Sequence, residues 1–178
     1  MIDGTFIYAE FDNKEGPVIR AYYSPPGKDL LDEEIRRVKL FSIPQMGQIG
    51  EVYESGLFVF VVSEDKICIS VYRYLSGKVR TLTGASLASL SFVTEQTINP
   101  FRLKPFLESL MRPLFRIVVN NEILKQIYEA IQASTDGKIY VENKKAKVPV
   151  RITARLPALS EIPDSYWLLN EQSRELGK

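Results

Sequence analysis

The side chains of this sequence that could do acid–base chemistry form two pairs of neighbouring carboxylates. Glu10 and Asp12 are two residues apart, and Glu64 and Asp65 are adjacent. Paired carboxylates can serve as general acid and general base when their surroundings separate the two pKa values. Both pairs lie at polar turns, where Asp and Glu are favoured for local hydrogen bonds. We interpret them as turn residues and keep an enzyme that uses Glu10 and Asp12 as an alternative hypothesis.

Histidine and thiolate chemistry is excluded by composition. The chain has no histidine, which removes Ser-His-Asp and Cys-His catalysis and histidine metal ligation. Cys68 is the single cysteine, so an intrachain disulfide and a thiolate-rich metal site are excluded. Its apolar surroundings predict a buried structural thiol. The glycines Gly47 and Gly50 lack the lysine and hydroxyl of a phosphate-binding loop. The sequence therefore predicts no catalytic residue, metal or cofactor.

Charge is balanced overall but not locally. The chain has 23 Lys and Arg residues and 22 Asp and Glu residues, so no overall field attracts nucleic acid, and no nucleic acid partner is expected. One basic cluster, opposed only by Glu142, could meet an acidic protein, an anionic membrane or a nucleic acid backbone. Solvated strand faces explain it equally well. The cluster consists of Lys138, Lys144, Lys145, Lys147, Arg151 and Arg155.

The composition predicts a globular protein outside the secretory route. Apolar residues make up 45% and charged residues 25% of the chain, as in ordinary globular domains. Its opening lacks a signal-peptide pattern, and no run approaches about 18 consecutive apolar residues. We expect a soluble, cytoplasmic protein, with peripheral membrane contact as the alternative.

The clearest local structure is a β-hairpin near the start. Two apolar runs, Thr5–Phe11 and Val18–Tyr23, flank a polar turn that ends in Gly16 and Pro17. Gly16 can take a positive φ, and Pro17 suits the start of a strand. Arg20 and the prolines after Tyr23 predict that the second run is an edge strand.

The remaining elements follow from periodicity and turn signals. A helix is predicted from Asp29, with Asp32 completing a capping box and with an apolar stripe of Leu31, Ile35 and Val38. Pro44–Gly56 is predicted to be a loop, and Val79–Ser86 is ambiguous. Three further strands are predicted: Leu57–Val62, which is expected to be buried on both faces, Ile67–Tyr74 and Leu87–Thr94. Two further helices are predicted: one from Pro100 that could restart near Pro105, and one at Asn121–Ala133.

A C-terminal extension follows this pattern. The predicted domain spans residues 1–135, and the extension spans residues 136–178. The extension is expected to hold short strands at Lys138–Val141 and Lys147–Thr153. After them we expect a docking arm, Leu156–Lys178, whose apolar anchor is Tyr166–Leu169.

The opening FIYAEFDNKEGPVI resembles the first hairpin of longin-type domains, above all those that begin DENN modules and related regulators of lysosomal nutrient signalling. Gly16 and Pro17 stand where that hairpin has Gly-Pro. The segments GLFVFVVSEDKICISVYRYL, SLASLSFV and FLESLM are similar to the later strands and helix of the same module. The resemblance covers about residues 4–134.

The resemblance implies an α/β layered, longin/roadblock-like fold of order β-β-α-β-β-β-α-α. Its five-stranded antiparallel sheet would carry one helix on one face and two on the other. It further implies a non-enzymatic docking platform in small-GTPase regulation or membrane trafficking, whose partner is a small GTPase or a longin/roadblock-type protein. The larger half of a DENN module is not in this sequence, so exchange activity is not expected.

We expect partner contacts along the predicted sheet edge, on helix faces and in the basic cluster, and a homodimer with either a continuous sheet or paired helices. The alternative is a membrane-peripheral adaptor that uses the basic cluster. The partner-binding residues predicted are Val18, Arg20, Tyr22, Lys144, Lys145 and Lys147.

Overall fold

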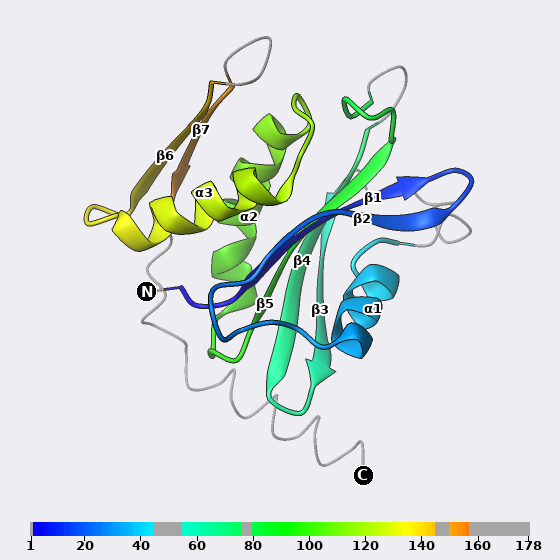
Figure 1. Ribbon diagram of the computed structural model, residues 1–178, viewed down its shortest axis with the longest axis horizontal. Coiled ribbons are helices and arrows are strands. Elements are labelled where there is room, and N and C mark those ends of the chain that lie inside the picture. The colour runs from blue at the N-terminus through cyan, green and yellow to red at the C-terminus, as the bar shows by residue number, and fades with distance from the viewer. Residues whose placement is uncertain (1, 45–54, 76–79, 145–149, 157–178) are drawn as a thin grey trace.

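The architecture is a five-stranded antiparallel sheet between helices (Figure 1). The structure is a computed structural model and describes residues 2–44, 55–75, 80–144 and 150–156. The strand order is β2-β1-β5-β4-β3. The expected layered α/β class, antiparallel sheet and element order are confirmed. The strands are β1 (Thr5–Asp12), β2 (Gly16–Tyr23), β3 (Ser55–Ser63), β4 (Lys66–Tyr74) and β5 (Leu87–Thr94).

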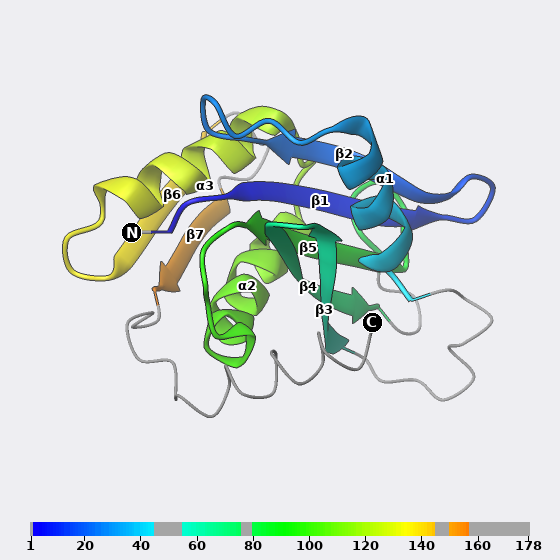
Figure 2. The same cartoon turned by 90° about the horizontal axis from the view of Figure 1, so that it is seen from below.

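One helix covers one face of the sheet and two cover the other (Figure 2). Helix α1 (Asp32–Phe41) packs on β2 and β3, and its Val38 joins a cluster with Ile7 and Cys68. Helices α2 (Pro100–Leu114) and α3 (Asn121–Ala133) form the larger core with the alternate strand residues. Because successive strand side chains point to opposite faces, the apolar strands β1, β4 and β5 supply both cores.

A second hairpin lies over α2 and α3, on their side away from the sheet (Figure 1). It consists of β6 (Lys138–Asn143) and β7 (Val150–Arg155). Ile139 and Ile152 are buried in the same cluster as the two helices. The hairpin therefore shares the main core of residues 1–135. The predicted arm with Tyr166–Leu169 lies outside the described residues.

The prediction that Leu57–Val62 is a doubly buried strand is wrong. This run belongs to β3 at one margin of the sheet, where Val59 is 45% and Val61 is 58% exposed. The strand whose residues are all buried is β5, which carries three serine and threonine residues. Apolar composition fits burial on both faces, but the position of a strand in the sheet depends on its distant neighbours.

The predicted start of the first helix is also wrong. Helix α1 begins at Asp32 and not near Asp29, with Leu31 as its N-cap residue. The Glu34 carboxylate accepts a hydrogen bond from the Leu31 N–H at 2.9 Å, so the third helical residue supplies the cap contact. Leu31, predicted in the apolar stripe, is 68% exposed. Val38 is buried as expected.

Helix α2 is continuous through both of its internal prolines. It runs from Pro100 to Leu114 without the restart considered near Pro105. Asn99 caps it by accepting a hydrogen bond from the Phe101 N–H at 3.0 Å. The described part of the ambiguous segment, residues 80–86, contains no strand.

Candidate interaction surface

The carboxylate pair of the first hairpin has its oxygen atoms engaged by the protein. Glu10 is 2% exposed. Its Oε1 accepts a hydrogen bond from the Tyr8 hydroxyl at 3.1 Å, and its Oε2 accepts one from Arg20 Nε at 3.1 Å and one from the Thr83 hydroxyl. Burial, with the Glu10 charge adding to it, raises the pKa of Tyr8 far above its ordinary range. Glu10 therefore ties the segment around Thr83 to β1.

Asp12 performs the turn chemistry expected of it. Its Oδ1 accepts hydrogen bonds from the backbone N–H groups of Lys14 and Glu15, at 2.8 and 3.0 Å. These bonds lower the pKa of the Asp12 carboxyl. Gly16 has a φ of 77°, which confirms the positive φ expected in this turn.

The β2 margin is an edge, as predicted, but its groups are largely engaged within the protein. Arg20 pairs with Glu10 at 3.1 Å. The Tyr22 N–H donates to Asn121 Oδ1 of α3 at 2.9 Å, and the Tyr22 hydroxyl accepts from Ser24 Oγ at 2.7 Å. Val18 is half-buried opposite Glu10. Helix α3 thus contacts the second half of this margin.

The basic residues of the extension lie on the outward face of the β6–β7 hairpin, where described. Lys138, Arg151 and Arg155 are exposed there, alternating with buried residues. Lys144 is exposed at the end of β6, whereas Lys145 and Lys147 lie outside the described residues. This alternation is the pattern of a solvated strand face.

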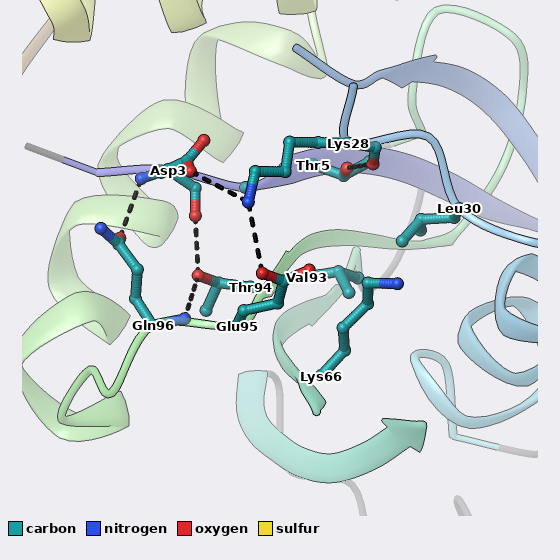
Figure 3. Close-up of a pocket in the computed structure, with 10 residues that line it drawn as sticks. Asp3, Thr5, Lys28, Leu30, Lys66, Val93, Thr94, Glu95 and Gln96 are labelled. Atoms are coloured by element: carbon teal, nitrogen blue, oxygen red, sulfur yellow. Dashed lines mark hydrogen bonds and ion pairs between the residues drawn. The ribbon is translucent and has the colours of Figure 1, made fainter. Parts of the chain in front are cut away.

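A small polar pocket lies where β1, β5 and the loop before α1 meet (Figure 3). Its volume is about 140 Å³. Lys28 Nζ lies 3.5 Å from Asp3 Oδ2 and 3.2 Å from Glu95 Oε2. The Glu95 carboxylate, with Asp3 contributing, raises the pKa of Lys28. The Thr94 hydroxyl donates to the Asp3 carbonyl at 2.7 Å.

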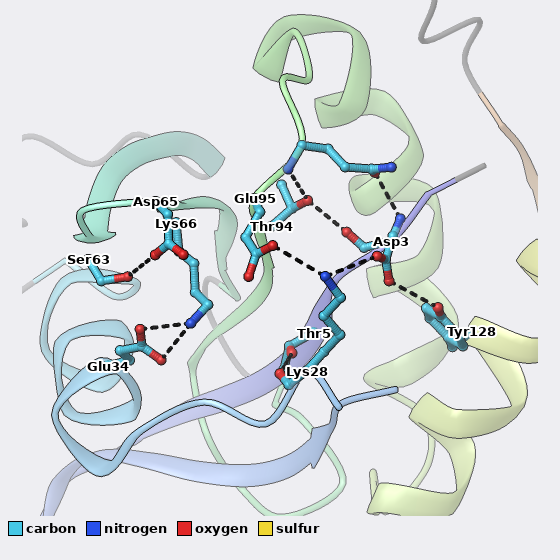
Figure 4. A network of polar contacts seen from close by, with 11 residues as sticks. Asp3, Thr5, Lys28, Glu34, Ser63, Asp65, Lys66, Thr94, Glu95 and Tyr128 are labelled. Atoms are coloured by element: carbon cyan, nitrogen blue, oxygen red, sulfur yellow. Dashed lines mark hydrogen bonds and ion pairs between the residues drawn. The ribbon is translucent and has the colours of Figure 1, made fainter. Parts of the chain in front are cut away.

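The second lysine of this pocket is also paired (Figure 4). Lys66 Nζ donates to Glu34 Oε1 at 3.0 Å, and the pair is mostly buried. The Tyr128 hydroxyl of α3 reaches Asp3 Oδ1 at 3.5 Å. Because both lysines have carboxylate partners, the pocket presents little uncompensated positive charge to an anion. Its contacts join the chain start to β5, α3 and the loop before α1.

The β3 margin combines a strand edge with exposed apolar side chains. Within the described residues, no strand pairs with the outer side of β3. Val59 and Val61 face the α2 side of the sheet, opposite Ile69 and Ile67 of β4, and remain 45% and 58% exposed. Unpaired backbone groups beside exposed apolar side chains favour association with another chain.

The end of α1 extends this surface on the other face of the sheet. Leu40 is 40% and Phe41 is 55% exposed. The centroids of the Phe41 ring and the Phe60 ring of β3 are 5.8 Å apart. Four of the nine large apolar side chains exposed in the described residues are Leu40, Phe41, Val59 and Val61. We call these four residues together with Phe60 the β3 surface.

The two ends of β3 carry different charges. At its start, a groove of about 460 Å³ between α2 and the β3–β4 pair is lined by Arg73, Arg112 and Glu108, whose carboxylate pairs with Lys104 Nζ at 2.9 Å. Neither arginine forms an ion pair within the described residues. At its other end, Glu64 and Asp65 are exposed in the turn to β4, where Ser63 Oγ donates to Asp65 at 3.1 Å.

Sequence reasoning missed the β3 surface because the whole run is apolar. One signal was available: Phe58 and Phe60 alternate with Val59 and Val61. The aromatic pair faces the α1 side and the valine pair faces the α2 side. An alternation of large and small apolar side chains indicates two differently filled faces.

No three or more His, Cys, Asp or Glu side chains gather as a metal site in the part of the chain that the structure describes. None of the described helices is both long enough and apolar enough to cross a membrane. Compared with known proteins, the chain matches no protein-family model and no curated protein sequence.

Proposed function

We propose that this chain is a non-enzymatic protein-interaction module of small-GTPase regulation or membrane trafficking, and that it binds its partner through the β3 surface. The observation that carries the proposal is a strand edge that pairs with no other strand within the described residues, next to exposed apolar side chains: Val59 and Val61 on one face of β3, and Leu40 and Phe41 at the end of α1 on the other. The class of partner, a small GTPase or a longin/roadblock-type module, comes from the resemblance of the first hairpin and of the element order to longin domains.

Strand edges support binding through two additive effects. The backbone N–H and C=O groups of an edge strand can pair with an added strand, which gives direction and register. Burial of apolar side chains then contributes roughly 25 cal/mol per Å². Val59, Val61 and Phe41 supply such side chains next to the open edge. The β2 margin offers less, because Asn121 already occupies the Tyr22 N–H.

The surroundings of the reactive groups favour binding over catalysis. Both oxygens of Glu10 accept hydrogen bonds from neighbouring side chains. The Cys68 thiol is fully buried, and burial raises its pKa well above the ordinary value. A neutral, buried thiol is a poor nucleophile. A carboxylate whose two oxygens already accept hydrogen bonds is a poor general base.

The proposal is tested with the double variant Val59→Lys and Val61→Lys of the full chain. Binding is measured against small GTPases in both nucleotide states and against longin/roadblock-type proteins. We expect the variant to lose about tenfold or more in affinity, since two charges replace apolar contacts. Tyr140→Lys, at a 53% exposed position on β6, is the matched control and should bind as the wild type does. If the double variant binds the partner with the affinity of the wild type, the proposed surface is wrong.

A second candidate is a membrane-peripheral adaptor acting through the basic cluster. It is favoured by the exposure of Lys138, Arg151 and Arg155 on one face of the β6–β7 hairpin. Flotation with anionic vesicles should fall when Lys144, Lys145 and Lys147 are replaced by Ala, because each basic residue near such a surface contributes about 1 kcal/mol. Unchanged flotation discards this candidate.

A further inference from the structure

The segment 80–86, between β4 and β5, sets an exposed hydroxyl against a buried carboxylate. Thr83 is exposed, and its hydroxyl donates a hydrogen bond to Glu10 Oε2, while Glu10 itself is 2% exposed. The two residues are 73 positions apart in the chain. The same carboxylate oxygen pairs with Arg20 Nε at 3.1 Å. One hydroxyl proton therefore fastens a surface segment to the charged centre of the first hairpin.

The backbone of this segment forms a tight turn. The Thr81 N–H donates to the Ala85 carbonyl at 2.9 Å, and the Ala85 N–H donates to the Thr81 hydroxyl at 3.0 Å. Gly84, between them, has a φ of 90°, which glycine adopts readily. Besides the hydroxyl contact with β1, the Leu82 N–H donates to the Phe115 carbonyl at the end of α2, at 3.1 Å. These few contacts hold the turn, so loss of one of them matters.

Arg80 stands three residues before Thr83 in the sequence. The spacing Arg-x-x-Ser/Thr suits protein kinases whose acidic side chains bind the arginine while the hydroxyl reaches the γ-phosphate of ATP. In this sequence, Thr83 and Ser76, which follows Arg73, are the hydroxyl residues with arginine at that spacing. Ser76 lies outside the described residues. Thr83 is exposed on an irregular surface segment, where modification is sterically accessible.

We propose that Thr83 is a phosphorylation site for a protein kinase that selects arginine three residues before its target, and that the phosphate releases the turn 81–85 from β1. In the reaction, Thr83 Oγ attacks the γ-phosphorus of ATP. The Oγ–P bond forms while the bond from the γ-phosphorus to the β–γ bridging oxygen breaks, and ADP leaves with that electron pair. The hydroxyl proton passes to a carboxylate base of the kinase. The product has no hydroxyl proton left to donate to Glu10.

The phosphate replaces an attraction at Glu10 by a repulsion. A phosphothreonine carries a charge of about −1.5 to −2 at pH 7, and next to Asp or Glu it disrupts a contact by like-charge repulsion. Glu10 is held in place by hydrogen bonds from Tyr8 and Arg20. If Arg20 turned to the phosphate, the buried Glu10 carboxylate would lose its charged partner, which is also costly. Both arrangements favour detachment of the turn.

The site is tested by incubating the full chain with ATP and a purified serine/threonine kinase of Arg-x-x-Ser/Thr specificity, and by locating phosphate with peptide mass spectrometry. We expect phosphate at Thr83, none there in Thr83→Ala, and incorporation about tenfold slower or worse in Arg80→Gln, because the kinase loses a charged contact. Arg151→Gln, at an arginine exposed two residues before Thr153, is the control and should be modified as the wild type is. No phosphate at Thr83, or phosphate at Ser76 alone, overturns the site.

Release of the turn is tested by hydrogen exchange of the phosphorylated and unmodified chains. The hydrogen-bonded amides of Thr81, Leu82 and Ala85 should exchange about tenfold faster after phosphorylation, because the turn opens more often. Thr83→Val, which removes the donor without adding charge, should accelerate exchange less. Phosphorylation should also have a smaller effect in Glu10→Gln, whose neutral amide can donate to the phosphate. No acceleration in the wild type, or equal acceleration in phosphorylated Glu10→Gln, overturns the proposed release.

Discussion

At the scale of single residues, Glu34 shows how one buried carboxylate joins separate elements. It is 4% exposed, accepts the Leu31 N–H at the start of α1, and pairs with Lys66 of β4 at 3.0 Å. Burial alone would raise the pKa of the Glu34 carboxyl. The Leu31 N–H and the Lys66 ammonium outweigh burial, and the pKa is lowered below its ordinary value of 4.5.

We predict that Glu34→Gln destabilises the protein by about 1–3 kcal/mol at pH 7, because Lys66 loses its charged partner. A lowered folded-state pKa means that this stability is present above pH 4.5 and is lost as the pH falls through the folded-state pKa. The difference between wild type and variant should therefore shrink in acid. Urea unfolding at several pH values measures it. Glu33→Gln, at a 71% exposed side chain, is the control, and a pH-independent difference contradicts the prediction.

Gly16 offers a test of backbone conformation without a steric contribution. Its φ is 77°, and a Cβ built there would meet no atom within 4 Å. We expect Gly16→Ala to lower the free energy of unfolding by about 1 kcal/mol, because alanine rarely adopts this conformation. The exposed Glu15→Ala serves as the control in thermal unfolding. A melting temperature equal to that of wild type would show that the turn relaxes freely.

At the scale of elements, the positions of β5 and β3 in the sheet are the reverse of what their compositions suggest. The more polar β5 is central, and the more apolar β3 lies at the margin. The central β5 carries Ser89 and Ser91, both fully buried. Ser91 donates to the Ser70 hydroxyl at 2.9 Å, and Ser70 donates to the Ser42 carbonyl at 3.2 Å. Because the hydroxyls satisfy one another and the backbone after α1, their burial costs little. The more apolar β3 remains at the margin of the sheet, where Val59 and Val61 stay exposed.

This serine chain leads to a prediction for the sheet interior. Ser70→Ala removes the acceptor of Ser91 and the donor to the Ser42 carbonyl, and we expect a loss of about 1–3 kcal/mol. Equilibrium unfolding in urea measures this loss. Ser109→Ala is the comparison, since its half-buried hydroxyl bonds only the Phe106 carbonyl at 2.7 Å in the described contacts. Equal losses for the two variants would argue against a coupled chain.

At the scale of the whole molecule, the two margins of the sheet differ. The β2 margin is covered in part by α3, where Asn121 bonds Tyr22 and Tyr128 packs on Tyr23 with ring centroids 5.4 Å apart. Within the described residues no strand pairs with the β3 margin, where Arg37 of α1 donates to the Val61 and Val62 carbonyls at 3.4 Å and the Val59 and Val61 side chains stay exposed. This difference between the margins agrees with the proposal that a partner binds at the β3 surface.

The hairpin itself is predicted to be necessary for stability. Ile152 is fully buried in the main core between β7 and the helices. We expect Ile152→Ala to cost about 2–5 kcal/mol, within the range for deleting buried aliphatic groups. The neighbouring exposed Thr153→Ala should change stability by less than about 0.5 kcal/mol. Thermal unfolding compares them. A small effect of Ile152→Ala would mean that the hairpin is a separate unit.

The sequence by itself determined the local structure and excluded histidine-dependent chemistry and an intrachain disulfide. Turn residues and side-chain periodicity located the helices and strands of the described residues to within a few residues, including the Gly16 turn. Helix α1 begins at Asp32 instead of Asp29, because the Glu34 side chain supplies the cap contact at Leu31. The absence of histidine and the single cysteine came directly from composition.

The tertiary structure alone decided which strand is central, which edge is open and which charges are free. Arg20 looked like a free edge charge, yet Glu10 neutralises it across the hairpin. Arg73 and Arg112 are distant in sequence but line one groove. The physical reason is that side-chain patterns report which face of an element is buried, whereas strand order and ion pairing depend on contacts between residues far apart in the chain.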